Sequence, residues 1–144
     1  MRLEPLYHVQ FTTQQRWSVE VPGEAGGEEY AFLLVEGHVR GRVNATLHGA
    51  NSPRRRPDGV LTPNFRGVLE CDDGASILFA WHGYGLTGDA GEHRLVGSIT
   101  HVAGEARYRW LNEVIGAVAG EVRPREDGRL DVVLDVSELV WERP

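Results

Sequence analysis

The chain has very little cysteine and no long hydrophobic run. Of its 144 residues only Cys71 is a cysteine, which excludes an internal disulfide and a four-thiolate zinc site. No stretch of about 18 apolar residues occurs, and the first residues lack the apolar core of a secretory signal. We therefore expect a protein of the reducing cytoplasm with no membrane partner.

Net positive charge is absent as well. The formal net charge is -6, which argues against a general nucleic-acid binder. The one basic cluster, Arg54-Arg55-Arg56, lies between Pro53 and Pro57, and we interpret it as a solvated loop tip. The alternative interpretation is an arm that binds a phosphate or a carboxylate, because guanidinium groups suit both anions.

Motifs for metal binding and covalent catalysis are also missing. The chain has no Gly-x-Ser-x-Gly sequence and no glycine loop in the strand-to-helix setting that binds phosphates. Asp72 beside Cys71 disfavours a reactive thiolate. We expect no metal and no other cofactor, because the histidines lie on separate segments without a ligand-like spacing. They are His8, His38, His48, His82, His93 and His101.

Short alternating segments separated by glycine and proline make up most of the chain. The 18 glycines and 7 prolines disfavour long helices, and apolar residues recur at every second position, as in β-strands. Asp72-Asp73-Gly74 predicts a hairpin turn, and 83–91 a flexible loop. The strand-like segments are 7–11, 17–21, 30–35, 38–48, 64–71, 76–82, 95–102 and 130–136. Their number and spacing indicate an all-β sandwich or a closed barrel.

One segment carries a competing helical pattern. Trp110, Leu111, Val114, Ile115 and Val118 have helical spacing, but Gly116 and Gly120 would each weaken a long helix by roughly 1 kcal/mol. We expect a single helical turn at 108–112 followed by a strand.

Several short elements together resemble a known family. From about Leu6 to Val136 the chain is similar to the bacterial and fungal proteins grouped as domain of unknown function 3237. The matching elements are Gly49-Ala50, Arg56-Pro57-Asp58-Gly59-Val60, Arg66, Asp72-Asp73-Gly74-Ala75 with Ile77, and Tyr108-x-Trp110-Leu111-Asn112. The resemblance implies one domain over 1–144, folded as a closed antiparallel lipocalin-like barrel of about 8–10 strands with at most one short helix. Such a barrel has room for one small ligand.

The chain departs from the family at positions that tend to be acidic. Neutral residues stand at Asn51 and Asn64, and the family's Phe-Glu pair is replaced by His101-Val102. If those carboxylates transfer protons in relatives, this chain must do so differently or not at all. Histidine is the remaining acid–base candidate, because its pKa lies near neutrality.

The polar faces of the predicted strands supply the candidate site residues. Arg66, His82 and His101 are the catalytic candidates. The ligand-binding candidates are His48, Arg66, Trp81, His82, Trp110 and Asn112. Alternation alone leaves open whether the polar face lines the cavity or forms the outer surface of the barrel. Trp110 has the alternative role of closing one barrel end, and the Asn112 amide that of tying a turn to the backbone.

Three functions stay open at this point. The first is binding of a small, partly apolar ligand, such as a carboxylate or a polyketide-like ring system, inside the barrel. The alternative is a cofactor-independent isomerase, cyclase or lyase in which histidine moves a proton and Arg66 stabilises an oxyanion. The third is a homo-oligomer formed through edge strands or the Trp17 region.

Overall fold

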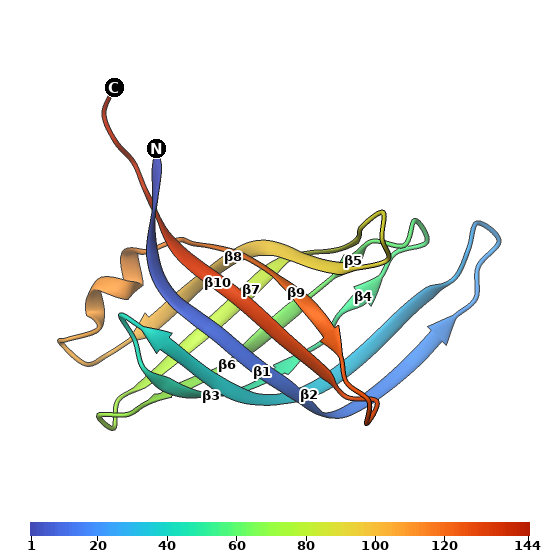
Figure 1. Ribbon diagram of the computed structural model, residues 1–144, viewed down its shortest axis with the longest axis horizontal. Helices are drawn as coiled ribbons and strands as arrows, with labels where there is room; N and C mark the ends of the chain where they lie inside the picture. The colour runs from blue at the N-terminus through green and yellow to red at the C-terminus, as the bar shows by residue number, and fades with distance from the viewer.

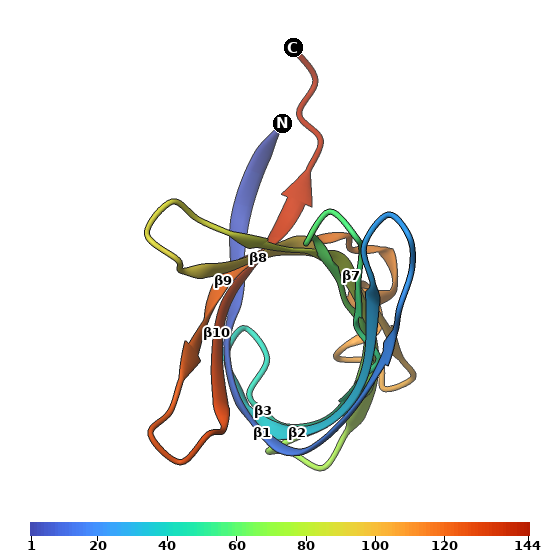
Figure 2. The same cartoon turned by 90° about the vertical axis from the view of Figure 1, so that its right-hand side faces the viewer.

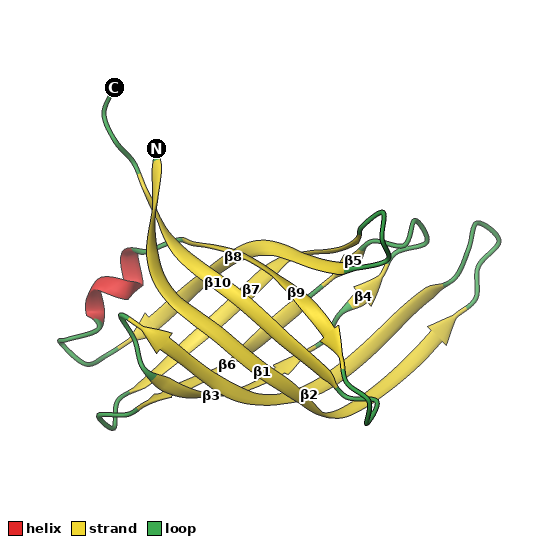
Figure 3. Ribbon diagram, viewed as in Figure 1, coloured by secondary structure: helices red, strands yellow, loops and turns green.

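The protein is built almost wholly from β-strands. The computed structural model describes residues 1–144, which form ten strands and one short 3-10 helix, η1 (Arg109–Glu113). Figures 1 and 3 show how these elements are arranged. No helix has the length and apolar character that crossing a bilayer would require. The strands are β1 (Arg2–Val21), β2 (Glu28–Gly41), β3 (Ala45–Asn51), β4 (Arg54–Arg55), β5 (Leu61–Thr62), β6 (Asn64–Cys71), β7 (Ser76–Thr87), β8 (His93–Ala103), β9 (Gly116–Pro124) and β10 (Leu130–Val140).

The long strands close into a ring. Antiparallel pairing runs β1–β10–β9–β8–β7–β6–β3–β2 and returns from β2 to β1. The short strands β4 and β5 bridge β2 and β7 at one end of this ring. Figure 2 looks along the ring, with the strands surrounding its centre. The prediction of a closed antiparallel barrel with one helical turn is confirmed, and the sandwich alternative is excluded.

Alternation along each strand separates an apolar interior from a polar exterior. On β6 and β7 the side chains of Phe65, Leu69 and Trp81 are buried, whereas those of Arg66 and His82 are exposed. Successive residues of a strand point to opposite faces, so one face of every strand reaches the same interior. The 26 buried hydrophobic residues form one contiguous core there. Burial of this apolar face is the main force that fixes the strand register.

Three predicted segment boundaries were wrong. The segments 7–11 and 17–21 are parts of one continuous strand, β1. The segment 38–48 is not one strand, because the chain turns between β2 and β3. The Asn44 side chain accepts a hydrogen bond from the Gly41 N–H and donates one to the Gly41 carbonyl. Gly41 has φ 153°, and a Cβ there would lie 2.7 Å from the Leu6 carbonyl oxygen. The predicted loop 83–91 was also too long, since β7 continues to Thr87.

The helix η1 closes one end of the barrel. Leu111 is fully buried against the core, and the hydroxyl of Tyr108 donates to the carboxylate of Asp73 in the β6–β7 turn. Arg107 forms an ion pair of 2.8 Å with the same carboxylate. These bonds fasten the helix across the strand ends, so the interior is reached from the opposite end of the barrel.

Candidate functional site

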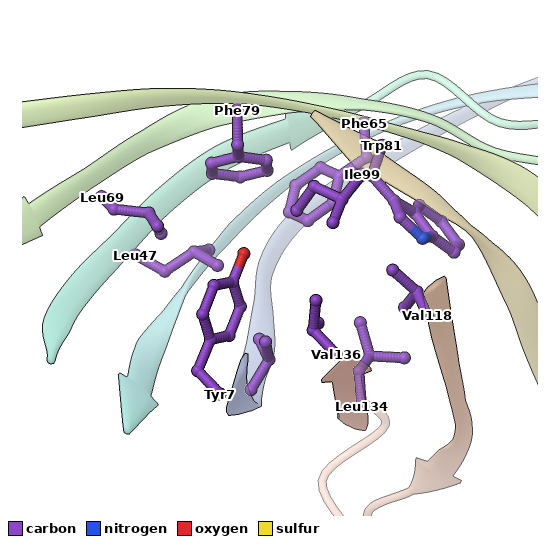
Figure 4. A pocket seen from close by; sticks show the side chains of 11 residues that line it. Tyr7, Leu47, Phe65, Leu69, Phe79, Trp81, Ile99, Val118, Leu134 and Val136 are labelled. Atoms are coloured by element: carbon purple, nitrogen blue, oxygen red, sulfur yellow. The ribbon is translucent and has the colours of Figure 1, made fainter. Parts of the chain in front are cut away.

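Two small apolar cavities lie in series inside the barrel. The first, here the deep cavity, has a volume of about 20 Å³ and only hydrophobic lining residues. Figure 4 shows the Tyr7 hydroxyl among these side chains. The second, here the throat, has a volume of about 90 Å³. Both are lined by Phe65, Trp81 and Leu134, so the two cavities adjoin.

A larger hollow, here the mouth, adjoins the throat at the end opposite η1. Its volume is about 370 Å³, and it shares Leu61, Leu95, Val122 and Leu130 with the throat. Mouth, throat and deep cavity therefore follow one another from the surface inward. The polar residues that line the mouth are Arg16, Glu29, Arg55, Thr87, His93 and Arg94.

The mouth carries an excess of positive charge on an acidic protein. Glu29 is the single carboxylate among its lining residues, at 2.9 Å from Arg16 and 3.3 Å from Arg55. Arg94 also borders the mouth, but it alternates with the buried Leu95 and lines an outer hollow with Glu121 and Arg123, so its guanidinium points outward. Arg16 and Arg55 against one glutamate leave the mouth able to bind an anion, since guanidinium groups match carboxylates and phosphates in geometry.

The basic cluster of the sequence is divided between this mouth and local ion pairs. Arg54 pairs with Glu28, and Arg56 pairs with Asp58, where the hydrogen bond from Arg56 lowers the pKa of the carboxyl to about 2. Arg55 lines the mouth. The loop-tip interpretation therefore fits Arg56 but not Arg54, which pairs with β2 and β5 as part of β4, and the anion-binding alternative is the one that suits Arg55.

A buried tyrosine–histidine pair lies at the inner end of the barrel. The Tyr7 hydroxyl lies 2.6 Å from His101 Nε2, and both side chains are buried. Burial lowers the pKa of His101 to about 4 and raises that of Tyr7. The imidazole is therefore neutral near pH 7. When Tyr7 donates, the imidazole proton lies on Nδ1, which has no hydrogen-bond partner.

Trp81 presents a second unpartnered donor. Its indole Nε1 is buried without a hydrogen-bond partner, and its ring lines both the deep cavity and the throat. Figure 4 shows the ring in the cavity wall beside Val118. Leaving a buried donor unpaired costs about 1–3 kcal/mol, which a ligand acceptor in the cavity would offset. Trp81 is thus the one predicted ligand-binding residue that lines the interior cavities.

Three other predicted site residues lie on the outer face of the barrel. Arg66 and His82 are exposed on β6 and β7, and His48 contacts Glu36 and Glu70 on the surface, with Nδ1 at 3.1 Å from the Glu36 carboxylate. Of the two faces that the alternation left open, these residues therefore lie on the outer one and do not line the cavities. Each alternates with buried neighbours, so its side chain points to solvent.

Trp110 and Asn112 hold the end of the barrel closed. Trp110 Nε1 donates to the Arg107 carbonyl at 3.0 Å, and the Arg42 guanidinium lies 4.5 Å from the centre of the indole ring. Asn112 accepts from the Ala103 N–H at 2.7 Å and donates to the Ala103 carbonyl at 2.9 Å. Neither residue lines the deep cavity, throat or mouth, so their assignment to ligand binding is corrected to the structural alternative.

No three histidine, cysteine, aspartate or glutamate side chains gather closely enough to hold a metal ion. Cys71 is buried, and burial raises the pKa of its thiol. The site is an apolar cavity lined by Trp81, with its unpartnered indole N–H, and by Tyr7, with arginines at its opening; His101 lies behind Tyr7 and lines no cavity.

The comparisons with known proteins identify a family and a fold. The model of the family described as a protein of unknown function (DUF3237) matches residues 1–139. A protein with unknown function from Clostridium acetobutylicum ATCC 824 has a similar structure, with 19% identity, a TM-score of 0.81 and coverage of 97% of this chain and 100% of that one. A β-barrel-like protein from Acinetobacter baumannii AYE is also 19% identical, with a TM-score of 0.76 and 96% coverage of both chains.

A structure described as an enzyme from Penicillium herquei is similar at 16% identity and a TM-score of 0.53, covering 94% of this chain and 97% of that one. At these identities the likeness concerns the fold. No curated protein matches the chain.

Proposed function

The chain belongs to the DUF3237 family of proteins of unknown function, and we propose that its barrel binds a small amphipathic anion. The apolar end of the ligand enters the throat, and its carboxylate or similar group binds the arginines of the mouth. The observation that carries this proposal is the continuous sequence of mouth, throat and deep cavity, which changes from charged to apolar inward.

The volumes decide how such a ligand sits. Ligand pockets have volumes of roughly 300–1,000 Å³, a range that includes the mouth at about 370 Å³. The throat, at about 90 Å³, admits a short alkyl end or small side group, and the deep cavity is about the size of a water molecule. Most of the ligand therefore occupies the mouth, with one end inserted toward Trp81.

The charge of the mouth selects among ligands of equal shape. A carboxylate near Arg16 and Arg55 gains charge-assisted hydrogen bonds, whereas a neutral alcohol of the same length gains only the burial of its chain. Octanoate and octan-1-ol are suitable probes for thermal-shift and calorimetric titrations. Octanoate should raise the melting temperature and octan-1-ol should do so less. Equal shifts for both probes, or none, would contradict the proposal.

Substitutions test whether octanoate binds in the throat and mouth or on the outer surface of the barrel. Val122 lines both throat and mouth, so Val122→Phe should block the junction and abolish the octanoate shift. Val96→Phe is the matched control, because Val96 lies on the outer face of β8, 40% exposed. Arg55→Gln should weaken octanoate binding, whereas Arg66→Ala on the outer surface should leave it unchanged. A blocked variant that still binds octanoate would move the site elsewhere.

Catalysis without a cofactor is the second candidate, and the Tyr7–His101 pair favours it. In the tautomer whose Nε2–H donates to the Tyr7 oxygen at 2.6 Å, the Tyr7 hydroxyl is free to donate to a carbonyl oxygen as negative charge develops there. The fold is compatible with this role, since one structural neighbour is described as an enzyme. The low pKa of His101, about 4, makes it a weak base, which is why binding ranks first.

Proton transfer can be tested on 7-oxooctanoate, an amphipathic anion whose carbonyl, with exchangeable hydrogens on the carbon beside it, lies at the apolar end that points toward Tyr7. Incubation in heavy water followed by proton NMR measures exchange at that carbon. An enzyme of this type should accelerate exchange above the buffer rate, and Tyr7→Phe should remove the acceleration while octanoate still binds. Exchange at the buffer rate with the unaltered protein would exclude this chemistry for the probe.

A further inference from the structure

The second half of β1 is a free sheet edge. The pairing of β1 with β10 ends at Thr12↔Asp131, whereas its pairing with β2 continues to Val21↔Glu28. Figure 1 shows the β1–β2 hairpin extending past the end of β10. From residue 13 to residue 21 one side of the strand therefore has no partner. Such an edge presents a row of unpaired N–H and C=O groups to any strand that can align with it.

A bulge turns apolar side chains outward along this edge. The register with β2 shifts between Thr13 and Gln15, and Thr13 is the last buried residue of the strand. Beyond the bulge, Trp17 lies opposite Phe32, with ring centroids 6.0 Å apart, and Val19 lies opposite Tyr30. Trp17 is 52% exposed and Val19 63%. An apolar strip thus follows the free edge on the outside of the barrel.

We propose that this edge pairs with the same edge of a second copy of the chain. In an antiparallel pair with a two-fold axis at Ser18, Arg16 lies opposite Glu20 of the second copy, and Trp17 lies opposite Val19 of the second copy. The two residues of each such pair share one face of the joined sheet. A two-fold contact is self-complementary, so each of these pairs occurs twice.

The charges fix this register. A two-fold axis at Trp17 would place Arg16 opposite Ser18, and an axis at Val19 would place it opposite Pro22. Only the axis at Ser18 matches the cation with Glu20. Like charges facing each other across the two edges would oppose pairing. Here Arg16 and Glu20, which carry opposite charges, lie at equal distances on either side of the axis at Ser18.

The single chain leaves Glu20 in need of a cation. Glu20 lies directly opposite Glu29 in the hairpin, an arrangement of like charges that is unfavourable across strands. Glu29 contacts Arg16 and Arg55, whereas Glu20 forms no ion pair within the chain. Arg16 of the second copy would supply the missing partner.

The apolar strip adds to the same contact. On the outer face of the joined sheet, Phe32 of β2 and Trp17 of β1 in one copy lie in a row with Val19 of β1 and Tyr30 of β2 in the second copy. The exposed parts of these side chains would then cover one another, which stabilises the pair through apolar burial. The contact explains why an exposed strand carries aromatic and β-branched residues, since an unprotected edge of that kind favours aggregation.

Sedimentation velocity with charge-swap variants tests the proposal. The unaltered protein should sediment as a dimer that dissociates on dilution. Arg16→Glu and Glu20→Arg each place like charges opposite one another twice, so each should raise the dissociation constant by roughly 30-fold or more. The double variant, Arg16→Glu with Glu20→Arg, restores opposite charges and should recover the dimer. Arg66→Glu is the control, because Arg66 is an exposed arginine on β6, a strand that does not pair with β1.

The outcomes separate this contact from other partners of the edge. A protein that stays monomeric at every concentration would overturn the proposal, and would direct attention to a membrane surface or a different protein as the occupant. A dimer that neither single variant weakens would place the interface elsewhere. Single variants that dissociate and a double variant that stays monomeric would refute the Arg16–Glu20 register. Circular dichroism of each variant verifies that the barrel has folded.

Discussion

The neutral imidazole of His101 should make the barrel lose stability in mild acid. Burial beside Tyr7 holds the folded-state pKa at about 4, whereas an unfolded chain has a histidine pKa of about 6.5. The unfolded chain therefore takes up the proton first as the pH falls. The stability due to the neutral imidazole is complete above about pH 6.5, decreases toward pH 4, and is lost below that value.

The size of the effect follows from the two pKa values. Their difference lowers the free energy of unfolding, relative to neutral pH, by about 3 kcal/mol at pH 4 and below and by about 2 kcal/mol at pH 5. The loss at pH 5 is a large share of the free energy of unfolding, which is roughly 5–15 kcal/mol for a single domain. It should lower the urea midpoint by about 1 M between pH 7.5 and pH 5, with a slope typical of a domain of this size.

Urea titrations of two variants isolate the contribution of His101. His101→Phe removes the titrating group, so its stability should fall much less between the two pH values, although the Tyr7 hydroxyl loses its acceptor at both. His82→Gln alters an exposed histidine and should behave as the unaltered protein does. If His101→Phe and the unaltered protein lose the same stability, the buried neutral imidazole is refuted.

Three further substitutions test the closed end and the curvature of the barrel by urea titration. Asn112→Ala removes both hydrogen bonds to Ala103 and should cost about 1–2 kcal/mol, and no loss would deny Asn112 its structural role. Leu111→Ala should cost about 2–5 kcal/mol, and a loss typical of a surface site would show that η1 does not close the core. Gly67→Ala should destabilise the barrel because its Cβ would lie 2.2 Å from the His48 carbonyl oxygen; a neutral effect would contradict that close strand approach.

Strand identity could be predicted because local chemistry determines it. The β6–β7 hairpin follows from alternation on both sides of Asp72-Asp73-Gly74, and Gly74 adopts the positive φ of 95° that such a turn favours. The direction of each face could not be predicted in the same way. On β7 the outer face includes Leu78, which is 57% exposed, so hydrophobicity alone did not separate inside from outside. Arg66 and His82 stayed among the site candidates for that reason, although both lie on the outer side.

The mouth escaped prediction because it exists only after closure. Arg16, Arg55 and Arg94 come from β1, β4 and β8, and no local spacing joins them. Tyr7 carried a weak signal as an aromatic in an apolar alternation, but its partner His101 lies 94 residues away. The sequence did reveal the Tyr108-x-Trp110-Leu111-Asn112 element. Its hydrogen bonds hold η1 against one end of the barrel.

A crystal structure of the protein soaked with 8-bromooctanoate tests the binding proposal most directly, since anomalous scattering locates the bromine. Bromine density in the throat beside Trp81, with the carboxylate against Arg16 or Arg55, is the predicted result. Bromine on the outer face, or an unoccupied throat at a concentration that saturates binding in solution, would contradict the account.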